Sequence, residues 1–349
     1  MIRQAACVSN KANLFQVCSR CTSSHPLFKP LIERNRSVLA RAITLTESTL
    51  EPHKENASSL MSDVLKHNAS LNTLRIGISG PPGAGKSTFI ETFGLHLADM
   101  GNRVAVLAVD PSSSLSGGSL LADKTRMQHL SVHKSAFIRP SPSRGHLGGV
   151  ARATNDAIQL CEAGGYNVVI VETVGAGQSE IAVANMTDIF VLLVPPGSGD
   201  ELQGIKKGIV EVADMILVTK ADGNLKTSAR MVKTEYSRAM RLLRSDHANA
   251  WKPFVTMISS VTGEGINESW EDIKEFKEAM LESGQFQQRR QRQRISWLWD
   301  YVQEELLDLL RSDKSVCQLS KELEGKVREG SVTSSFAAHS ILKEFLKRQ

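Results

Sequence analysis

The chain has 349 residues, 41% of them hydrophobic and 23% charged, with a formal net charge of +5. A chain of this length can bury the core of one large domain with extensions. Its longest apolar runs are strand-sized and fall short of the roughly 18 to 20 residues that a membrane-spanning helix requires. The composition therefore predicts a soluble protein with no membrane partner.

The positive charge is concentrated at the N-terminus. Residues 1–40 carry six Lys and Arg residues against a single acid, Glu33, so the rest of the chain is close to neutral. A near-neutral core does not support nucleic-acid binding, and we expect no such partner. Residues 1–32 lack acids and are rich in Ser, Ala, Cys and Leu, which is typical of a mitochondrial transit peptide and predicts the mitochondrial matrix. A disordered basic tail is the alternative.

Residues 33–72 are expected to form an N-terminal helical arm, since their apolar positions recur at weakly helical spacing interrupted near Pro52. Residues 73–264 then change pattern. Segments rich in β-branched residues alternate there with helix-length stretches, which predicts an α/β fold with a mostly parallel, doubly wound sheet. The expected strands are 74–79, 103–109, 167–171, 189–194, 215–219 and 254–258.

Residues 265–349 are expected to be helical, in the segments 266–281, 295–310, 316–327 and 336–346. A strong apolar face, with Trp297 and Trp299 as packing anchors, is predicted for the second of these segments. Residues at helical spacing define that face: Ile295, Leu298, Trp299, Val302, Leu306 and Leu309. The Gln- and Arg-rich run 287–294 is interpreted as a solvated helix start or linker.

A phosphate-binding loop follows the first expected strand. The pattern G-x-x-x-x-G-K-[ST] is met by Gly80-Pro81-Pro82-Gly83-Ala84-Gly85-Lys86-Ser87, with Thr88 next in the expected helix. Glycines let backbone N–H groups and the helix N-terminus face the anion. Lys86 is expected to be a solvent-facing catalytic lysine that reaches the β- and γ-phosphates, and Ser87 is expected to coordinate Mg²⁺.

Three acids are candidates for the surroundings of that Mg²⁺ ion, which prefers hard oxygen ligands. Asp110 and Glu172 end expected strands, and Asp123 lies in the loop after Asp110. Carboxyl ends of strands are the ligand-binding edge of a doubly wound sheet. Each acid alone could be a helix cap or a solvated side chain, but together they predict a metal site.

A switch sequence begins at Glu172, which is also a candidate catalytic residue. The segment Glu172-Thr-Val-Gly175 stands where a D-x-x-G element is expected, so the Gly175 amide would contact the γ-phosphate. The residue after Gly175 is Ala176, and the nearest glutamine is Gln178. No water-positioning glutamine can therefore be assigned, and intrinsic turnover should be slow.

The base is expected to be guanine. Thr219-Lys220-Ala221-Asp222 resembles an [NT]-K-x-D element at the end of a strand. Asp222 would accept hydrogen bonds from N1 and N2 of guanine, which adenine lacks, and Lys220 would pack on the base plane. Backbone amides of Ile258, Ser259 and Ser260 are expected near guanine O6.

Together these residues resemble the MeaB-type G-protein chaperones, a branch of the P-loop GTPases, from about residue 40 to the C-terminus. The resemblance rests on long, specific motifs: 79–90, 108–113, 117–120, 123–127, 139–142, 172–175, 200–206 and 251–253. It implies a homodimeric GTPase, with residues 265–349 as the dimerisation region. It also implies a chaperone of methylmalonyl-CoA mutase that gates adenosylcobalamin loading and protects or reactivates the mutase.

The resemblance further implies GTP or GDP and Mg²⁺ as ligands, with no cobalamin bound by the GTPase itself. Asp110, Asp123 and Glu172 match family positions around Mg²⁺. The segment 200–206 resembles a mobile family loop in which Lys206, or Gln203, approaches the γ-phosphate when the mutase is bound. Without the resemblance, Lys206 reads as part of an ordinary basic helix face.

Three alternatives stay open. A P-loop small-molecule kinase would need an acceptor pocket and usually an Arg-bearing lid, and the Thr219–Asp222 element argues against it. A metal-delivery GTPase of the same superfamily would carry His or Cys ligands in its core, where Cys161 is isolated and the histidines do not cluster. A scaffold could bind the nucleotide without turnover.

Overall fold

The computed structural model describes residues 24–48, 50–67, 73–110, 127–142, 147–173, 179–197, 207–243 and 251–347. In these residues it contains one seven-stranded sheet with the strand order β3-β2-β4-β1-β5-β6-β7, and all neighbouring strands are parallel. The strands are β1 (Leu74–Ser79), β2 (Val104–Asp110), β3 (Ala136–Pro142), β4 (Val168–Thr173), β5 (Ile189–Val194), β6 (Met215–Val218) and β7 (Phe254–Met257).

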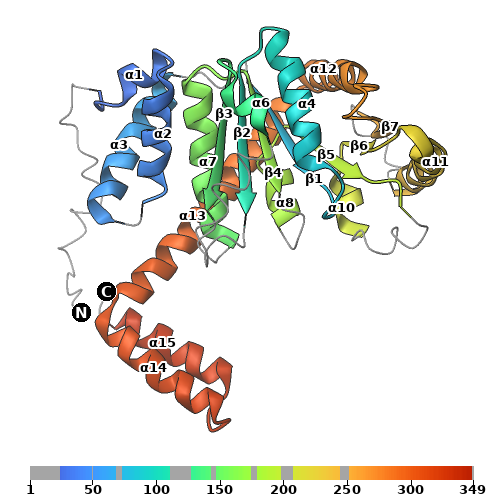
Figure 1. Ribbon diagram of the computed structural model, residues 1–349. Coiled ribbons are helices and arrows are strands. Elements are labelled where there is room, and N and C mark those ends of the chain that lie inside the picture. Colours follow the sequence, from blue (N-terminus) through green and yellow to red (C-terminus); the bar gives the residue numbers. More distant parts are fainter. Residues whose placement is uncertain are drawn as a thin grey trace, which may run out of the picture.

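Helices cover both faces of the sheet (Figure 1). One face packs on α4 (Lys86–Asp99), α6 (Gln128–Val132) and α12 (Ile266–Glu282). The other packs on α7 (Leu147–Ala163), α8 (Ser179–Ala184), α10 (Lys207–Val212) and α11 (Lys226–Leu243), the last preceded by η3 (Gly223–Leu225). Alternate strand residues point to the two faces and feed two separate hydrophobic cores. The predicted doubly wound parallel sheet is confirmed.

The edge strand β3 was missed by the sequence patterns. Its residues include Pro140 and Pro142, which lack the N–H group that a central strand must donate. Because β3 pairs only with β2, one of its sides needs no ladder partner. Proline is tolerated in an edge strand for this reason, and its presence hid the strand from the pattern.

The N-terminal arm consists of α1 (Phe28–Ile32), α2 (Arg36–Thr46) and α3 (Glu51–His67), and it lies beside α7 (Figure 1). Pro52 lies in the first turn of α3, where its missing N–H group has no helical partner to lose. Leu31 is fully buried, and the backbone N–H of His25 donates to Asp63 at 2.8 Å. Residues 25–32 therefore pack with the arm, and the predicted leader boundary at residue 32 stays a prediction.

The C-terminal region is helical, as expected. After α12 it continues with α13 (Gln285–Ser312), α14 (Lys314–Arg328) and α15 (Ser334–Leu346). The helix α13 packs against α7 and then runs out of the body to the α14–α15 pair, which lies away from the sheet (Figure 1).

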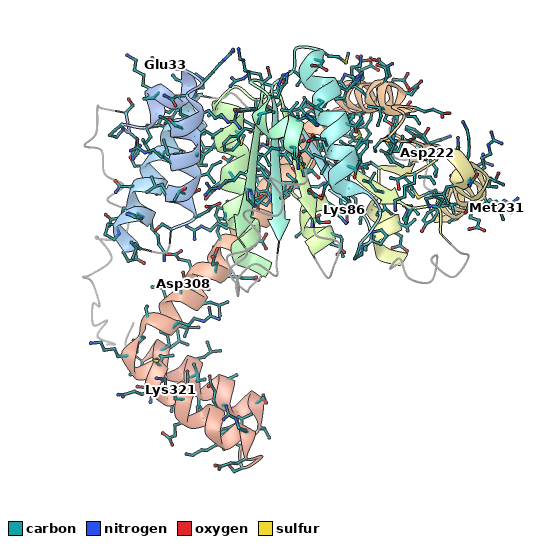
Figure 2. The ribbon with its side chains drawn as sticks, in the orientation of Figure 1. Glu33, Lys86, Asp222, Met231, Asp308 and Lys321 are labelled. Atoms are coloured by element: carbon teal, nitrogen blue, oxygen red, sulfur yellow. The ribbon has the colours of Figure 1, made fainter. Side chains whose placement is uncertain are left out.

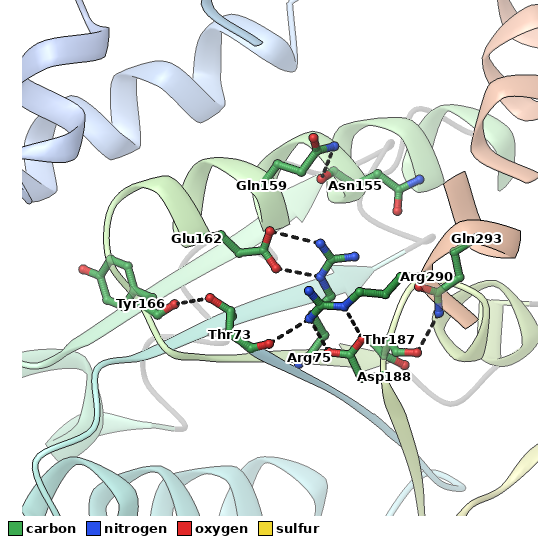
Figure 3. Close-up of polar contacts among 10 residues, drawn as sticks. All are labelled: Thr73, Arg75, Asn155, Gln159, Glu162, Tyr166, Thr187, Asp188, Arg290 and Gln293. Atoms are coloured by element: carbon green, nitrogen blue, oxygen red, sulfur yellow. Dashed lines mark hydrogen bonds and ion pairs between the residues drawn. The ribbon is translucent and has the colours of Figure 1, made fainter. Parts of the chain in front are cut away.

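The Gln- and Arg-rich run 287–294 is inside α13, and its interpretation as a solvated segment is wrong for two of its residues. Arg290 is 7% exposed and forms an ion pair with Asp188, with Nη2 and Oδ2 2.6 Å apart. Its Nη2 also donates to the carbonyl of Thr73 at 2.7 Å (Figure 3). Gln293 is 5% exposed and donates to the carbonyl of Thr187 at 2.7 Å. The residues just before β1 and β5 supply the hydrogen-bond acceptors for these buried polar groups.

The apolar side of α13 also differs from its prediction. Trp297 is buried, as expected of a packing anchor, and the Arg75 guanidinium lies 5.6 Å from the centre of its ring. Trp299, in contrast, is 62% exposed. The other residues of the predicted apolar face are exposed as well: Ile295, Leu298, Val302, Leu306 and Leu309. We call these five residues and Trp299 the apolar face of α13.

Candidate nucleotide site

The loop from Gly80 to Gly85 joins the central strand β1 to α4, and its glycines are required by geometry. Gly83 and Gly85 have φ values of 81° and 85°, in the left-handed region that favours glycine. A Cβ atom on Gly80 would lie 2.4 Å from the carbonyl oxygen of Leu193 on β5. The loop is therefore bound closely to the sheet at its start and opens into the N-terminus of α4, where backbone N–H groups favour anions.

Lys86 lies in the first turn of α4 and is 9% exposed. Its ammonium group donates to the carbonyl oxygens of Gly80, at 2.8 Å, and Pro81, at 3.2 Å. The prediction of a solvent-facing side chain is therefore wrong, since the loop curls around the lysine and supplies its acceptors. Figure 2 shows Lys86 at the beginning of α4.

Ser87 and Glu172 are brought together from distant parts of the sequence. The Ser87 hydroxyl donates to Glu172 Oε1 at 3.2 Å, and Glu172 is 7% exposed at the end of β4. In the β2–β4 register Glu172 lies opposite Ala108, so the backbone of Asp110 follows two residues later on the neighbouring strand. Two of the four predicted metal-site residues are thus in contact, and a third is at the same sheet edge.

The segment after β6 is hydrogen-bonded to the phosphate loop. The hydroxyl of Thr219 donates to the carbonyl of Ala84 at 2.8 Å. Lys220 has a φ of 52°, which is uncommon for a residue with a side chain, and its Cε lies 4.0 Å from a Cβ atom built on Gly85. The aliphatic stem of Lys220 therefore runs beside the loop, as required of a side chain that packs on a base.

The carboxylate of Asp222 is held by the segment after β7. Ser259 donates its hydroxyl to Asp222 Oδ2 and accepts from the backbone N–H of Thr262 at 3.1 Å. The backbone N–H of Ala221 donates to the carbonyl of Ile258 at 3.0 Å. The sequence had assigned only backbone amides to residues 258–260, and it missed the side chain of Ser259 as an orienting group.

Three threonines were also missed. Besides Thr219, Thr92 on α4 donates to the carbonyl of Ser260 at 3.0 Å, and Thr173 at the end of β4 donates to the hydroxyl of Ser79 at 2.9 Å. Each hydroxyl links the loop–α4 unit or the end of β1 to a different strand end. Thr219 and Thr173 lie within predicted motifs, but no motif indicates the partners of these hydroxyls, because those depend on which strands are neighbours.

Other predicted site residues lie outside the described residues: Asp123, Gly175, Gln203 and Lys206. Thr88 and Pro82 are described, and they lie in α4 and in the loop before it. Among the described residues, no group of three or more His, Cys, Asp or Glu side chains could hold a metal ion. None of the described helices is long and apolar enough to cross a membrane.

Comparisons with known proteins place this chain in one family. The family model described as "Methylmalonyl Co-A mutase-associated GTPase MeaB" matches residues 39–315. A mouse protein named "Methylmalonic aciduria type A homolog, mitochondrial" is 49% identical over 330 residues, which cover 92% of this chain and 79% of the mouse protein. A probable GTPase of Mycobacterium bovis is 48% identical over 309 residues, which cover 88% of this chain and 91% of the relative.

A solved structure agrees with the fold. The crystal structure of a LAO/AO transport system kinase superposes with a TM-score of 0.69 at 36% sequence identity. The match covers 92% of this chain and 96% of that protein. The similarity therefore includes both the sheet and most of the helical regions around it.

Proposed function

This chain belongs to the family of MeaB-type, methylmalonyl Co-A mutase-associated GTPases, and we propose that it is the G-protein chaperone of a methylmalonyl-CoA mutase. As a GTPase of that family it binds GTP and GDP. In the proposed role it gates the loading of adenosylcobalamin and protects or reactivates the mutase, while binding no cobalamin itself. The family name and the name of the mouse relative support this role.

One observation carries the assignment of the site residues: four sequence motifs converge and are hydrogen-bonded to one another at the carboxyl edge of the sheet. Thr219 ties the base-reading segment to the phosphate loop, and Thr92 ties α4 to Ser260. Ser259 orients Asp222. We assign the phosphates to residues 80–88 with the Gly175 amide, and guanine to Lys220, Asp222 and residues 258–260.

The residues of the proposed metal site suit Mg²⁺. A hydroxyl and a carboxylate 3.2 Å apart, on Ser87 and Glu172, are the hard oxygen donors that this ion prefers. In our proposal Ser87 binds the ion, and Glu172, Asp110 and Asp123 hold its surroundings. When bound there, Mg²⁺ neutralises charge that develops on the phosphates. Lys86 supplies a second positive charge beside the same loop.

Guanine recognition is tested by replacing Asp222. Removing two charge-assisted hydrogen bonds should weaken GDP binding by about 3 kcal/mol, and hence by roughly a hundredfold or more, while ADP binding stays weak in both proteins. Isothermal calorimetry on wild type and Asp222→Ala measures this difference, with Lys226→Ala on the exposed start of α11 as control. Equal affinities of the wild type for ADP and GDP would favour the kinase alternative.

The proposed partner acts through the segment 200–206. Since no glutamine directly follows Gly175, the isolated protein should hydrolyse GTP slowly, and the partner would have to bring a charged group to the γ-phosphate. We propose Lys206 for this task, with Gln203 as the neighbouring candidate. Charges delivered in this way accelerate related reactions by roughly 10³-fold or more.

Single-turnover GTP hydrolysis with and without the mutase tests this mechanism. Lys206→Ala should keep basal turnover and GTP affinity but lose most of the stimulation. Lys207→Ala, at the first residue of α10, is the matched control and should be stimulated like wild type. A Lys206→Ala protein that is stimulated as strongly as wild type would contradict the mechanism.

We also propose a homodimer and a mitochondrial location. The exposed apolar face of α13 supports the dimer, because large apolar patches on a soluble protein mark interaction sites. The mouse relative is named mitochondrial. If a leader is removed, its end should precede His25, where the packed arm begins. A fluorescent reporter fused to residues 1–24 should therefore enter the matrix, and a cytosolic reporter would contradict this.

A further inference from the structure

The carboxyl end of β1, where the phosphate loop begins, contacts the neighbouring strand on each side. On the β5 side, Gly80 approaches the Leu193 carbonyl so closely that a Cβ atom would lie 2.4 Å from it. On the β4 side, Thr173 Oγ1 donates to Ser79 Oγ at 2.9 Å. Thr173 and Ser79 are 0% and 1% exposed. The hydroxyl pair is therefore sealed from water at the place where the phosphate loop begins.

This pair continues the β1–β4 ladder by side chains. The last backbone pairing in that register is Ile78 with Glu172, and Ser79 and Thr173 come next on the two strands. The side-chain hydrogen bond therefore holds β4 against β1 directly after Glu172. Glu172 is the residue whose carboxylate accepts from Ser87.

The fold does not need a hydroxyl at position 173, and burying one there has an energetic cost. The preceding residues of β4 are apolar except for Glu172, and valine would fill the same volume as threonine. Burying a hydroxyl is unfavourable unless it is hydrogen-bonded, and the Thr173 hydroxyl donates to the hydroxyl of Ser79. This hydrogen bond thus satisfies the Thr173 donor at the junction of the phosphate loop and the switch sequence.

We propose that Thr173 is a positioning residue for GTP hydrolysis. Its hydroxyl fixes the end of β4 against the phosphate loop, so that Glu172 faces Ser87 at the Mg²⁺ ion. The proposal rests on the assignment of Glu172 and Ser87 to the metal site made above. Thr173 itself touches neither the nucleotide nor the ion. Its loss should change turnover and the dependence on Mg²⁺, with little effect on the binding of GDP.

Three variants of the full-length protein test this role. Thr173→Val keeps the shape and removes the hydroxyl, Thr173→Ser keeps the hydroxyl, and Ser79→Ala removes the acceptor. For Thr173→Val we expect a single-turnover rate about tenfold lower and a half-saturating Mg²⁺ concentration about tenfold higher, the size of one net hydrogen bond. GDP affinity should stay within about threefold, and Thr173→Ser should restore both changed quantities.

Ser79→Ala provides an independent measurement if Thr173→Val does not fold. It should reproduce the tenfold losses, and the double variant should be no worse than either single variant, because both remove the same interaction. A Thr173→Val or Ser79→Ala protein with wild-type rate and Mg²⁺ dependence overturns the proposal, as does a Thr173→Ser protein that stays impaired. A wild-type protein without Mg²⁺-dependent turnover overturns the proposed metal site and this role together.

Discussion

The two halves of α13 reverse the usual relation between polarity and burial. In the first half, Arg290 and Gln293 are buried against the amino ends of the strands. In the second half, Trp299 and Leu306 face outward, with exposed fractions of 62% and 48%. The sequence patterns predicted a solvated run at 287–294 and a packing role for Trp299, and both predictions are wrong. The comparison shows that the available partner, rather than the residue type, decides which side of a helix is buried.

The first half of α13 is held by a network of ion pairs and hydrogen bonds. The carboxylate of Asp188 accepts from Arg290 Nε at 2.7 Å and from the backbone N–H of Arg75 at 2.8 Å. Beside it, Arg289 binds Asp214 with two hydrogen bonds of 3.0 Å. The Arg75 guanidinium in turn pairs with Glu162, with Nε and Oε1 2.7 Å apart. Figure 3 shows the Arg290 and Arg75 pairs side by side.

The largest expected effect comes from breaking this network. Arg290→Ala leaves the buried Asp188 carboxylate without its guanidinium, which should lower the free energy of unfolding by about 3–5 kcal/mol. Arg292→Ala, two residues away and exposed, should change it by less than about 0.5 kcal/mol. Urea denaturation followed by circular dichroism measures both variants. Similar stabilities of the two would show that the first half of α13 is only loosely attached.

The second prediction concerns one of the contacts between the second half of α13 and the body of the protein. Tyr301 donates its hydroxyl to Asp156 on α7 at 3.0 Å, yet burial raises the pKa of Asp156 to about 6, against the lowering effects of Tyr301 and Arg152. The folded state therefore holds this proton at a higher pH than the unfolded chain. The contribution of Asp156 to the free energy of unfolding should therefore be lost as the pH rises from about 4 to 6, and it should be absent above that pH.

Asp156→Asn removes the titrating group and should flatten this part of the pH profile. Relative to wild type, its free energy of unfolding should rise by up to about 3 kcal/mol between pH 4 and pH 7, the energy that corresponds to a shift of roughly two pKa units. Denaturation curves across that range test it, with Asp99→Asn, which replaces an exposed acid at the end of α4, as control. A pH-independent difference between variant and wild type would contradict the prediction.

The smallest expected effect is on the proposed dimer. It is measured by comparing substitutions of an exposed and a buried tryptophan of α13. Trp299→Ala should leave the stability of the monomer nearly unchanged and weaken the proposed dimer by about 2 kcal/mol, a roughly 30-fold rise in its dissociation constant. Trp297→Ala should do the reverse, because Trp297 is 7% exposed and packs in the body. Sedimentation equilibrium separates the two. An unchanged dimer in Trp299→Ala would place the interface elsewhere.

The sequence motifs of the candidate nucleotide site are local, whereas the contacts between them are not. The loop from Gly80 to Ser87 and the element ending at Asp222 have fixed local patterns, so both could be recognised in the sequence. The hydrogen bonds that connect them to other segments could not be predicted from such patterns. The hydrogen bonds of Thr219 to Ala84 and of Ser259 to Asp222 join residues 135 and 37 positions apart, and no local pattern encodes such pairs.

The sequence by itself determined the parallel α/β fold, because strand-sized apolar runs alternating with helices can be buried only in a sheet covered on both faces. It also determined the motif of the phosphate loop and the motif on which the proposed guanine recognition rests, because both motifs consist of neighbouring residues. The tertiary structure alone decided that β3 is an edge strand that accepts Pro140 and Pro142, and that Arg290 is buried while Trp299 is exposed. Both outcomes have one physical reason: hydrogen-bond and packing partners far along the chain set the cost of burying a group, and only the folded chain brings them together.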